Sequence, residues 1–177
     1  MTERTYSFAY GRGEKSFTID DDLVISEVRT RPFPVIPKDQ IREKVLETIR
    51  NPIGTKPLAE IVKPGDTVAF ICNDPTRVAN SFDFMPVFVE ELNRLGIPDE
   101  NMRIVFALGT HRAMTEEEMA AQVGADVAKR LKTYNSISTI DEDFIEFGTT
   151  SRGTPVRINK HLCDCLLYTS PSPRDVE

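Results

Sequence analysis

Two short polar loops hold most of the residues in this chain that could carry chemistry. The first reads Asn73-Asp74-Pro75-Thr76-Arg77 and the second reads Gly109-Thr110-His111-Arg112. Together they supply a carboxylate, hydroxyl groups, two guanidinium groups and one of the two histidines of the chain. An imidazole can accept and return a proton near neutral pH, and a guanidinium offers a planar pair of donors. Polar groups of these kinds are the usual ingredients of a site when they converge.

Both loops directly follow apolar runs that predict β-strands. Thr67–Cys72 and Met102–Leu108 are rich in strand-forming residues and too short for buried helices. We therefore expect parallel strands, with the first of them central in its sheet and covered on both faces. A helical pattern follows each loop. The first helix is expected to carry Pro86 in its first turn and to end at Leu95, with Gly96 as the left-handed residue that follows it. The second begins with a capping box made of Thr115 and Glu118.

The repeated order of strand, loop and helix predicts parallel neighbours joined by right-handed crossovers. Ligands of open α/β sheets bind at the carboxyl ends of the strands, so we expect Asp74 and His111 at the same edge. A simpler interpretation makes Asp74-Pro75-Thr76 a plain turn and His111 a surface histidine. The position of both loops after buried-type strands favours a site. His161 lies outside this arrangement, and we expect no role for it.

The pattern as a whole predicts an α/β fold, a Rossmann-like and mostly parallel sheet with flanking helices, preceded by a small N-terminal β-hairpin. The hairpin comprises Tyr6–Tyr10 and Ser16–Ile19, joined by a glycine-rich turn. A third strand is expected at Leu23–Val28, and the proline-rich segment Arg31–Pro37 is expected to be an extended linker. The remaining predicted elements are a helix over Asp39–Arg50 and strands over Asn135–Ser138, Phe144–Phe147 and Pro155–Ile158.

Composition narrows the classes of function. A net charge of −6 opposes binding to nucleic acid and to anionic membrane surfaces. The polar N-terminus is no signal peptide, no apolar stretch reaches spanning length, and we expect a cytoplasmic protein. Cys72, Cys163 and Cys165 have no spacing typical of a zinc site. The sequence also has no glycine-rich phosphate loop and no serine in a nucleophile elbow.

The two loops, read with their flanking residues, resemble a known family. Asn73–Arg77, the segment Ala107–Glu118 and the upstream Asn51–Gly54 are similar to the N-terminal domain of nickel-dependent lactate racemases. The Asp-x-Thr-Arg and Gly-Thr-His-Arg motifs are fairly specific as an ordered pair, and the resemblance runs from the hairpin to about Cys165. It implies an isomerase that interconverts small 2-hydroxy acids.

The resemblance also implies a cofactor, the nickel-pincer nucleotide (nickel pyridinium-3,5-bisthiocarboxylate mononucleotide). A hydride from C2 of the substrate passes to its ring and returns to either face. His111 matches one of two histidines that exchange the hydroxyl proton, and Arg77 would hold a carboxylate or phosphate. Asp74, Pro75, Thr76 and Arg77 match the segment that contacts the cofactor.

The resemblance places the second histidine, the covalent lysine, the nickel ligand and a C-terminal domain after the position of Cys165. We therefore expect residues 1–165 to be an incomplete N-terminal α/β domain without metal ligands, residues 166–177 to be a non-native or disordered tail, and the chain alone to be inactive. Two alternatives stay open: a nucleotide- or cofactor-binding module without racemase chemistry, and a structural fragment. The particular 2-hydroxy acid and a homodimeric state are also open.

Overall fold

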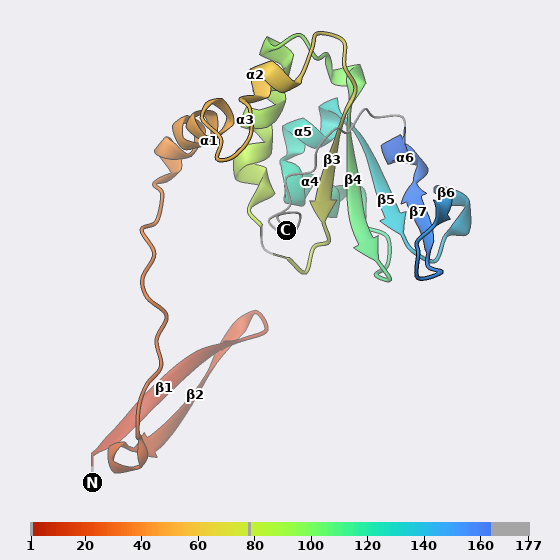
Figure 1. Cartoon of the computed structure of the whole chain (residues 1–177). Coiled ribbons are helices and arrows are strands. Elements are labelled where there is room, and N and C mark those ends of the chain that lie inside the picture. The colour runs from red at the N-terminus through yellow and green to blue at the C-terminus, as the bar shows by residue number, and fades with distance from the viewer. Residues whose placement is uncertain (1, 78, 164–177) are drawn as a thin grey trace. The chain divides into compact units, whose positions relative to one another are not determined.

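The N-terminal hairpin predicted from the sequence is formed by β1 (Glu3–Tyr10) and β2 (Gly13–Asp20), which pair antiparallel. This computed structural model describes residues 2–77 and 79–163 (Figure 1). It divides into unit 1, Met1–Val35, and unit 2, Ile36–Glu177. Each unit is described by itself below.

The hairpin has an aromatic face and a hydroxyl face, because successive side chains of a strand point to opposite sides. On one face the rings of Tyr6 and Phe17 stack with centroids 5.7 Å apart. On the other face the hydroxyls of Thr5 and Thr18 lie 2.9 Å apart, within hydrogen-bond distance. No described residue of unit 1 is buried.

The third strand predicted at Leu23–Val28 is wrong. A short 3-10 helix, Asp21–Leu23, follows β2, and the chain then has no regular secondary structure. The side chains of Ile25 and Val28 are almost fully exposed, and a strand pattern without a partner strand forms no ladder. The predicted linker over Arg31–Pro37 is confirmed as a segment without helix or strand.

Unit 2 contains the α/β part of the fold. Its elements in chain order are a 3-10 helix (Lys38–Gln40), α1 (Ile41–Arg50), α2 (Leu58–Ile61), β3 (Val68–Asn73), α3 (Ser81–Arg94), a 3-10 helix (Asp99–Asn101), β4 (Met102–Gly109), α4 (Glu116–Val123), α5 (Ala125–Arg130), β5 (Lys132–Ile137), a 3-10 helix (Asp141–Asp143), β6 (Phe144–Thr149), β7 (Pro155–Asn159) and α6 (Lys160–Cys163).

The main sheet has the order β3-β4-β5, and both pairs of neighbours are parallel. This confirms the predicted parallel pairing of the strands that precede the two polar loops. The prediction that β3 is the central, doubly covered strand is wrong. β4 is central, while β3 lies at one side of the described sheet, and its Ile71 side chain is 51% exposed.

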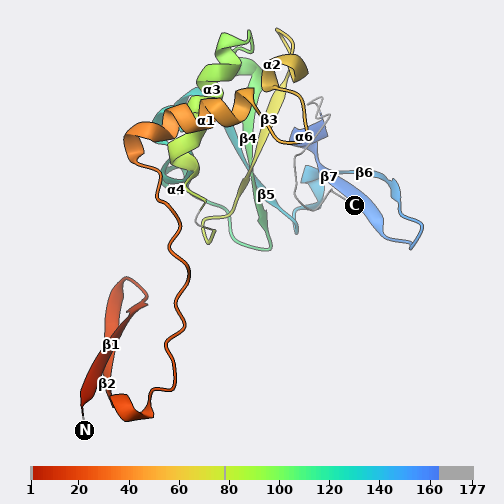
Figure 2. The same cartoon turned by 60° about the vertical axis from the view of Figure 1, so that its left-hand side comes forward.

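Helices α3, α4 and α5 cover one face of this sheet. In Figure 1, α3, α4 and α5 lie together on one side of the three arrows, and Figure 2 shows α1 crossing α3. The core forms where these helices meet alternate strand residues, because those residues point to the covered face. Its fully buried members include Ile104, Phe106, Val89, Leu92 and Val123.

Helix α3 differs from the prediction at one point. Pro86 was expected in the first turn, where its missing N–H does no harm, but the helix begins at Ser81 and Pro86 lies inside it. The expected termination at Gly96 is confirmed: this glycine has φ +90°, and an added Cβ would lie 3.0 Å from Pro64.

The last predicted strands form a separate antiparallel hairpin, β6 with β7, beyond β5 in Figure 1. The hairpin therefore does not extend the parallel ladder. The boundary predicted after Cys165 and the tail 166–177 lie outside the described residues. Within the described part of the chain, no helix is long and apolar enough to cross a membrane.

Candidate active site

The two polar loops leave the sheet at the same edge, as predicted. Asn73, the last residue of β3, is in register with Ala107 of β4, so both strands end at the lower edge in Figure 1. Nδ1 of His111 lies 3.6 Å from Oδ1 of Asp74. The structure thus brings together an imidazole and a carboxylate that are far apart in the sequence.

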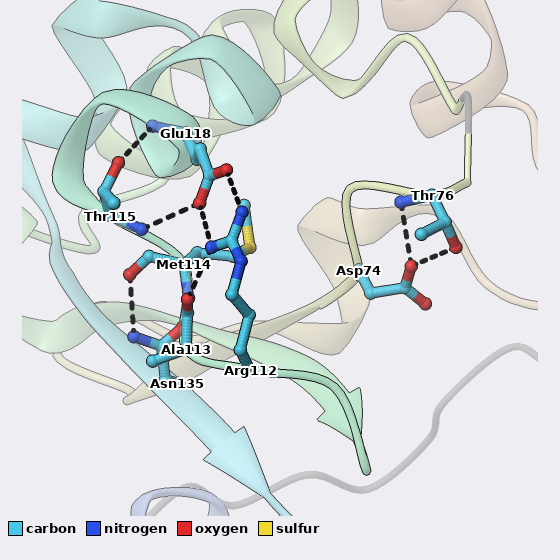
Figure 3. Close-up of polar contacts among 8 residues, drawn as sticks. All are labelled: Asp74, Thr76, Arg112, Ala113, Met114, Thr115, Glu118 and Asn135. Atoms are coloured by element: carbon cyan, nitrogen blue, oxygen red, sulfur yellow. Dashed lines mark hydrogen bonds and ion pairs between the residues drawn. The ribbon is translucent and has the colours of Figure 1, made fainter. Parts of the chain in front are cut away.

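The first loop is a tight turn closed by its own polar groups. The N–H of Arg77 donates to the Asp74 carbonyl at 3.1 Å, and the Asn73 amide donates to the Arg77 carbonyl at 3.1 Å. The Asp74 carboxylate accepts hydrogen bonds from the hydroxyl and the backbone N–H of Thr76 (Figure 3). The simple turn considered from the sequence is therefore present, but its carboxylate also faces His111.

The same hydrogen bonds set the charge state of this carboxylate. The Thr76 hydroxyl and then the Thr76 N–H hold the pKa of Asp74 below its ordinary value, and the charges of His111 and Arg77 act in the same direction. The Asp74 side chain is 16% exposed, whereas that of His111 is 47% exposed. Asp74 is therefore a fixed anion at neutral pH beside an accessible imidazole.

The second loop turns sharply at Gly109, whose φ of +60° suits a residue without Cβ. The N–H of His111 donates to the Leu108 carbonyl at 3.0 Å. The N–H and the hydroxyl of Ser138 both donate to the Gly109 carbonyl, at 2.7 and 2.9 Å. The loop is thereby attached to the end of β5 on one side of His111.

Asn135 of β5 fixes the loop on the other side of His111. Its amide accepts a hydrogen bond from the N–H of Met114 at 3.1 Å and donates to the Met114 carbonyl at 3.2 Å (Figure 3). Sequence reasoning missed both Asn135 and Ser138 as supports of the site. The available signal was a polar residue at position 135, in register with the buried Phe106.

The two arginines of the loops have different environments. Arg112 forms a two-point ion pair with Glu118, at 2.6 and 2.8 Å, and this glutamate also completes the capping box with Thr115 (Figure 3). The guanidinium of Arg77 is exposed and makes no hydrogen bond or ion pair with residues 2–77 or 79–163. Arg77 is thus the arginine with donors available to an anion.

Other candidate ligands lie away from this edge. His161 stacks on Tyr134 with ring centroids 3.6 Å apart. Burial raises the pKa of the Cys72 thiol to about 11, and the Cys163 thiol donates to the Asn159 carbonyl. Among the described residues, no cluster of three histidine, cysteine or acidic side chains could hold a metal ion. The arrangement at the edge suits proton transfer and anion binding.

Comparisons with known proteins point to one family. The family of the lactate racemase N-terminal domain matches residues 10–170. A lactate racemase from Lactiplantibacillus plantarum is 28% identical over 152 residues, which cover 86% of this chain and 36% of that protein. A lactate racemase from Thermoanaerobacterium thermosaccharolyticum is 26% identical over 151 residues, covering 85% and 35%. The chain therefore spans little more than a third of these relatives.

Solved structures agree with this result. The lactate racemase apoprotein from Thermoanaerobacterium thermosaccharolyticum superposes with a TM-score of 0.69 at 27% identity, covering 89% of this chain and 36% of that one. A protein from Thermotoga maritima shares the fold, with a TM-score of 0.54 at 20% identity over 72% of this chain and 31% of that one. The family match extends over nearly the whole sequence. This chain belongs to the lactate racemase N-terminal domain family.

Proposed function

We propose that this chain forms the N-terminal part of the active site of a 2-hydroxy acid racemase or epimerase that acts on lactate or a related acid. Its membership of the family and its two lactate racemase relatives support this proposal. The observation that carries it is the position of His111 and Arg77 on neighbouring loops at one sheet edge. One offers an accessible imidazole and the other a guanidinium without a hydrogen-bond partner among the described residues.

The proposed roles follow from the chemistry of a 2-hydroxy acid. When C2 loses and regains hydride, the hydroxyl group must give up its proton and take it back, and the accessible ring of His111 is suited to exchange it. The substrate carboxylate needs two donors in a fixed plane, which the guanidinium of Arg77 provides. Arg112 cannot substitute for Arg77 without giving up its pair with Glu118.

The cofactor implied by the family is a nickel-pincer nucleotide, and the first loop fits its anionic part. The guanidinium of Arg77, which has no partner among the described residues, and the exposed turn at Pro75 and Thr76 can approach a phosphate or carboxylate. When bound, this cofactor would supply the acceptor for the hydride from C2 of the substrate. Within the predicted segment Asp74–Arg77 we assign Pro75, Thr76 and Arg77 as the contacts, and no metal ligand is assigned within the described residues.

A cofactor-binding module without racemase chemistry is the competing proposal. It would use the same first loop but would not depend on His111. The two proposals therefore differ in the effect of removing the imidazole while Arg77 stays in place.

A hybrid enzyme separates these proposals. In it, residues 10–163 of this chain replace the matching segment of the Thermoanaerobacterium thermosaccharolyticum racemase, and the hybrid is loaded with cofactor. Interconversion of the two lactate enantiomers is followed by a chiral assay. We expect His111→Ala to lower turnover by about 10²–10⁴-fold with normal cofactor content. Arg77→Lys should also lower activity strongly, whereas the matched control Arg112→Lys should change it little.

The outcomes are distinct. Near-normal turnover of the His111→Ala hybrid would contradict the assignment of a proton-exchanging histidine and favour the cofactor-binding module. Equal losses in Arg77→Lys and Arg112→Lys would contradict the assignment of the carboxylate to Arg77. A cofactor-loaded but inactive unmutated hybrid would count against the proposed function as a whole.

A further inference from the structure

We infer that Asp74 is a positioning residue, which holds the proton of His111 on Nδ1 and leaves Nε2 to exchange a proton with the substrate. This inference rests on the proposed function and deepens it. It separates Asp74 from the residues that contact the cofactor. It also assigns a function to the contact between the two loops, which the sequence motifs do not show.

The orientation of the Asp74 carboxylate is fixed by Thr76, independently of His111. Both hydrogen bonds from Thr76 go to Oδ1 of Asp74, and this is the same oxygen that lies 3.6 Å from Nδ1 of His111. The two hydrogen bonds from Thr76 use the two lone-pair sites of Oδ1, whereas Oδ2 accepts no hydrogen bond from a described residue, so the carboxylate keeps acceptor capacity for the ring. The Asp74 side chain is held in one orientation, with its acceptor directed at the second loop.

The imidazole is carried by an equally fixed backbone. The contacts of Ser138 with Gly109 and of Asn135 with Met114 attach the loop to β5 on both sides of His111. The separation of 3.6 Å is longer than a hydrogen bond, and contacts of catalytic groups commonly shorten when substrate binds.

Among the described residues, no arginine pairs directly with this carboxylate. Arg112 is bound to Glu118, and Arg77 forms no ion pair with a described residue although its charge is felt at Asp74. Within the part of the chain that the structure describes, the ion-pair partner of Asp74 is His111. The anion is thus available to the imidazole.

The chemical consequence concerns the tautomer of the neutral ring. An anionic acceptor at Nδ1 favours the form with its proton on that nitrogen, and the lone pair is then on Nε2. Nε2 can accept the hydroxyl proton of a 2-hydroxy acid, and the resulting imidazolium is stabilised by Asp74. Return of the proton from Nε2 restores the starting state, so the proton balance closes without another reagent.

The test uses this chain with ¹⁵N-labelled histidine. Its two histidines give two sets of ring signals, and those of His111 are identified by their loss in His111→Gln. The ¹⁵N shifts report which ring nitrogen carries the proton. We expect the Nδ1–H form in the unaltered chain and a shift to Nε2–H in Asp74→Ala. Thr76→Val should shift the population in the same direction, whereas Thr76→Ser, which keeps the hydroxyl, should not.

Asp66→Ala is the matched control. Asp66 also accepts a hydrogen bond within a tight turn, from the N–H of Lys63 at 2.8 Å, but it lies before β3 rather than after it. Its loss should leave the His111 signals unchanged. If His111 is mainly Nε2–H in the unaltered chain, or keeps its tautomer in Asp74→Ala and Thr76→Val with intact backbone spectra, the inference is overturned.

Kinetics of the cofactor-loaded hybrid give an independent readout. We expect Asp74→Ala to lower kcat by about 10²-fold with little change in KM or in cofactor content. A loss of cofactor with normal turnover per loaded enzyme would make Asp74 a cofactor contact and would refute the positioning role. Failure of the proposed function appears separately, as retained turnover in His111→Ala.

Discussion

Replacing Glu91 by glutamine should destabilise unit 2 in a manner that depends on pH. Glu91 lies on α3 and its side chain is only 5% exposed. Arg94 donates to both carboxylate oxygens at 2.9 Å, and Arg50 of α1 reaches the same two oxygens at 3.4 and 3.5 Å. One buried carboxylate thus joins the two helices through two arginines.

The expected loss of unfolding free energy follows from the charge state of this carboxylate. The hydrogen bond from Arg94 is the main cause that lowers the pKa of Glu91 from 4.5 to about 2. Each pKa unit corresponds to about 1.4 kcal/mol, which gives an upper value of roughly 3 kcal/mol at neutral pH. Both arginines are more than half exposed, so screening by solvent reduces the expected contribution to about 1–2 kcal/mol.

The sign of the pH dependence is fixed by the direction of this shift. A lowered pKa in the folded state stabilises the protein above the unfolded value of 4.5, and that stability is lost as the pH falls towards 2. The unaltered chain should therefore exceed Glu91→Gln in unfolding free energy at pH 7. The difference should shrink steadily between pH 5 and pH 2.

Urea unfolding measures this difference in unfolding free energy. It is followed by the helical circular dichroism signal, because the chain contains no tryptophan for a fluorescence assay. Glu90→Gln is the matched control. Glu90 also connects α3 to α1, through Arg42, but both side chains are about half exposed or more, and its loss should cost under about 0.5 kcal/mol. Equal effects of the two substitutions, or a Glu91 effect that is the same at pH 7 and pH 2.5, would refute the reasoning.

Two further predictions concern a helix terminus and a thiol. Thr115→Ala removes the hydroxyl that accepts the Glu118 N–H at the start of α4, and should lower the unfolding free energy by about 1 kcal/mol in the same urea assay. An unchanged midpoint would contradict the role of the cap. Cys72 should react more slowly with iodoacetamide at pH 8 than the partly exposed Cys163, because burial raises its pKa to about 11. Peptide mass spectrometry measures both rates, and equal rates would argue against a closed core around Cys72.

The features of the fold that the sequence predicted correctly are those set by local patterns. The hairpin, the parallel pairing of β3 with β4 and the capping box at Thr115 each depend on residues close in the chain or on a repeated order. The position of β3 in the sheet could not be predicted from such local patterns. An apolar run predicts that a strand is buried, but whether Ile71 is covered depends on which elements pack there.

Two other incorrect predictions, a third strand and the position of Pro86 in its helix, have similar causes. The pattern of Leu23–Val28 suits a strand, yet a strand needs a partner, and in the described residues of unit 1 this segment pairs with none. The start of α3 is set by Asn80, whose backbone has φ +52°, a left-handed conformation that asparagine tolerates. This start leaves Pro86 inside the helix rather than in its first turn.

The candidate site also has features that local patterns predict and features that they do not. The placement of the polar loops at one sheet edge was predictable, because parallel strands end together. The supports of the second loop were not, since Asn135 and Ser138 lie well after His111 in the sequence and reach its loop only through the register of β4 with β5. The different environments of Arg77 and Arg112 likewise depend on side-chain geometry. The two motifs, Asp-x-Thr-Arg and Gly-Thr-His-Arg, both end in arginine and do not reveal this difference.

The order of strands in the main sheet has a consequence for how the protein is made. β3, β4 and β5 lie side by side in the order of their synthesis, so each new strand pairs with the one that precedes it. Pairing between successive strands keeps the loops that must close short, and domains form from the N-terminal side as a chain leaves the ribosome. The elements that hold Asp74 and His111 in place are β3, α3, β4 and β5, and all of them precede the β6–β7 hairpin in the chain. Asp74 and His111 can therefore meet before the β6–β7 hairpin has left the ribosome.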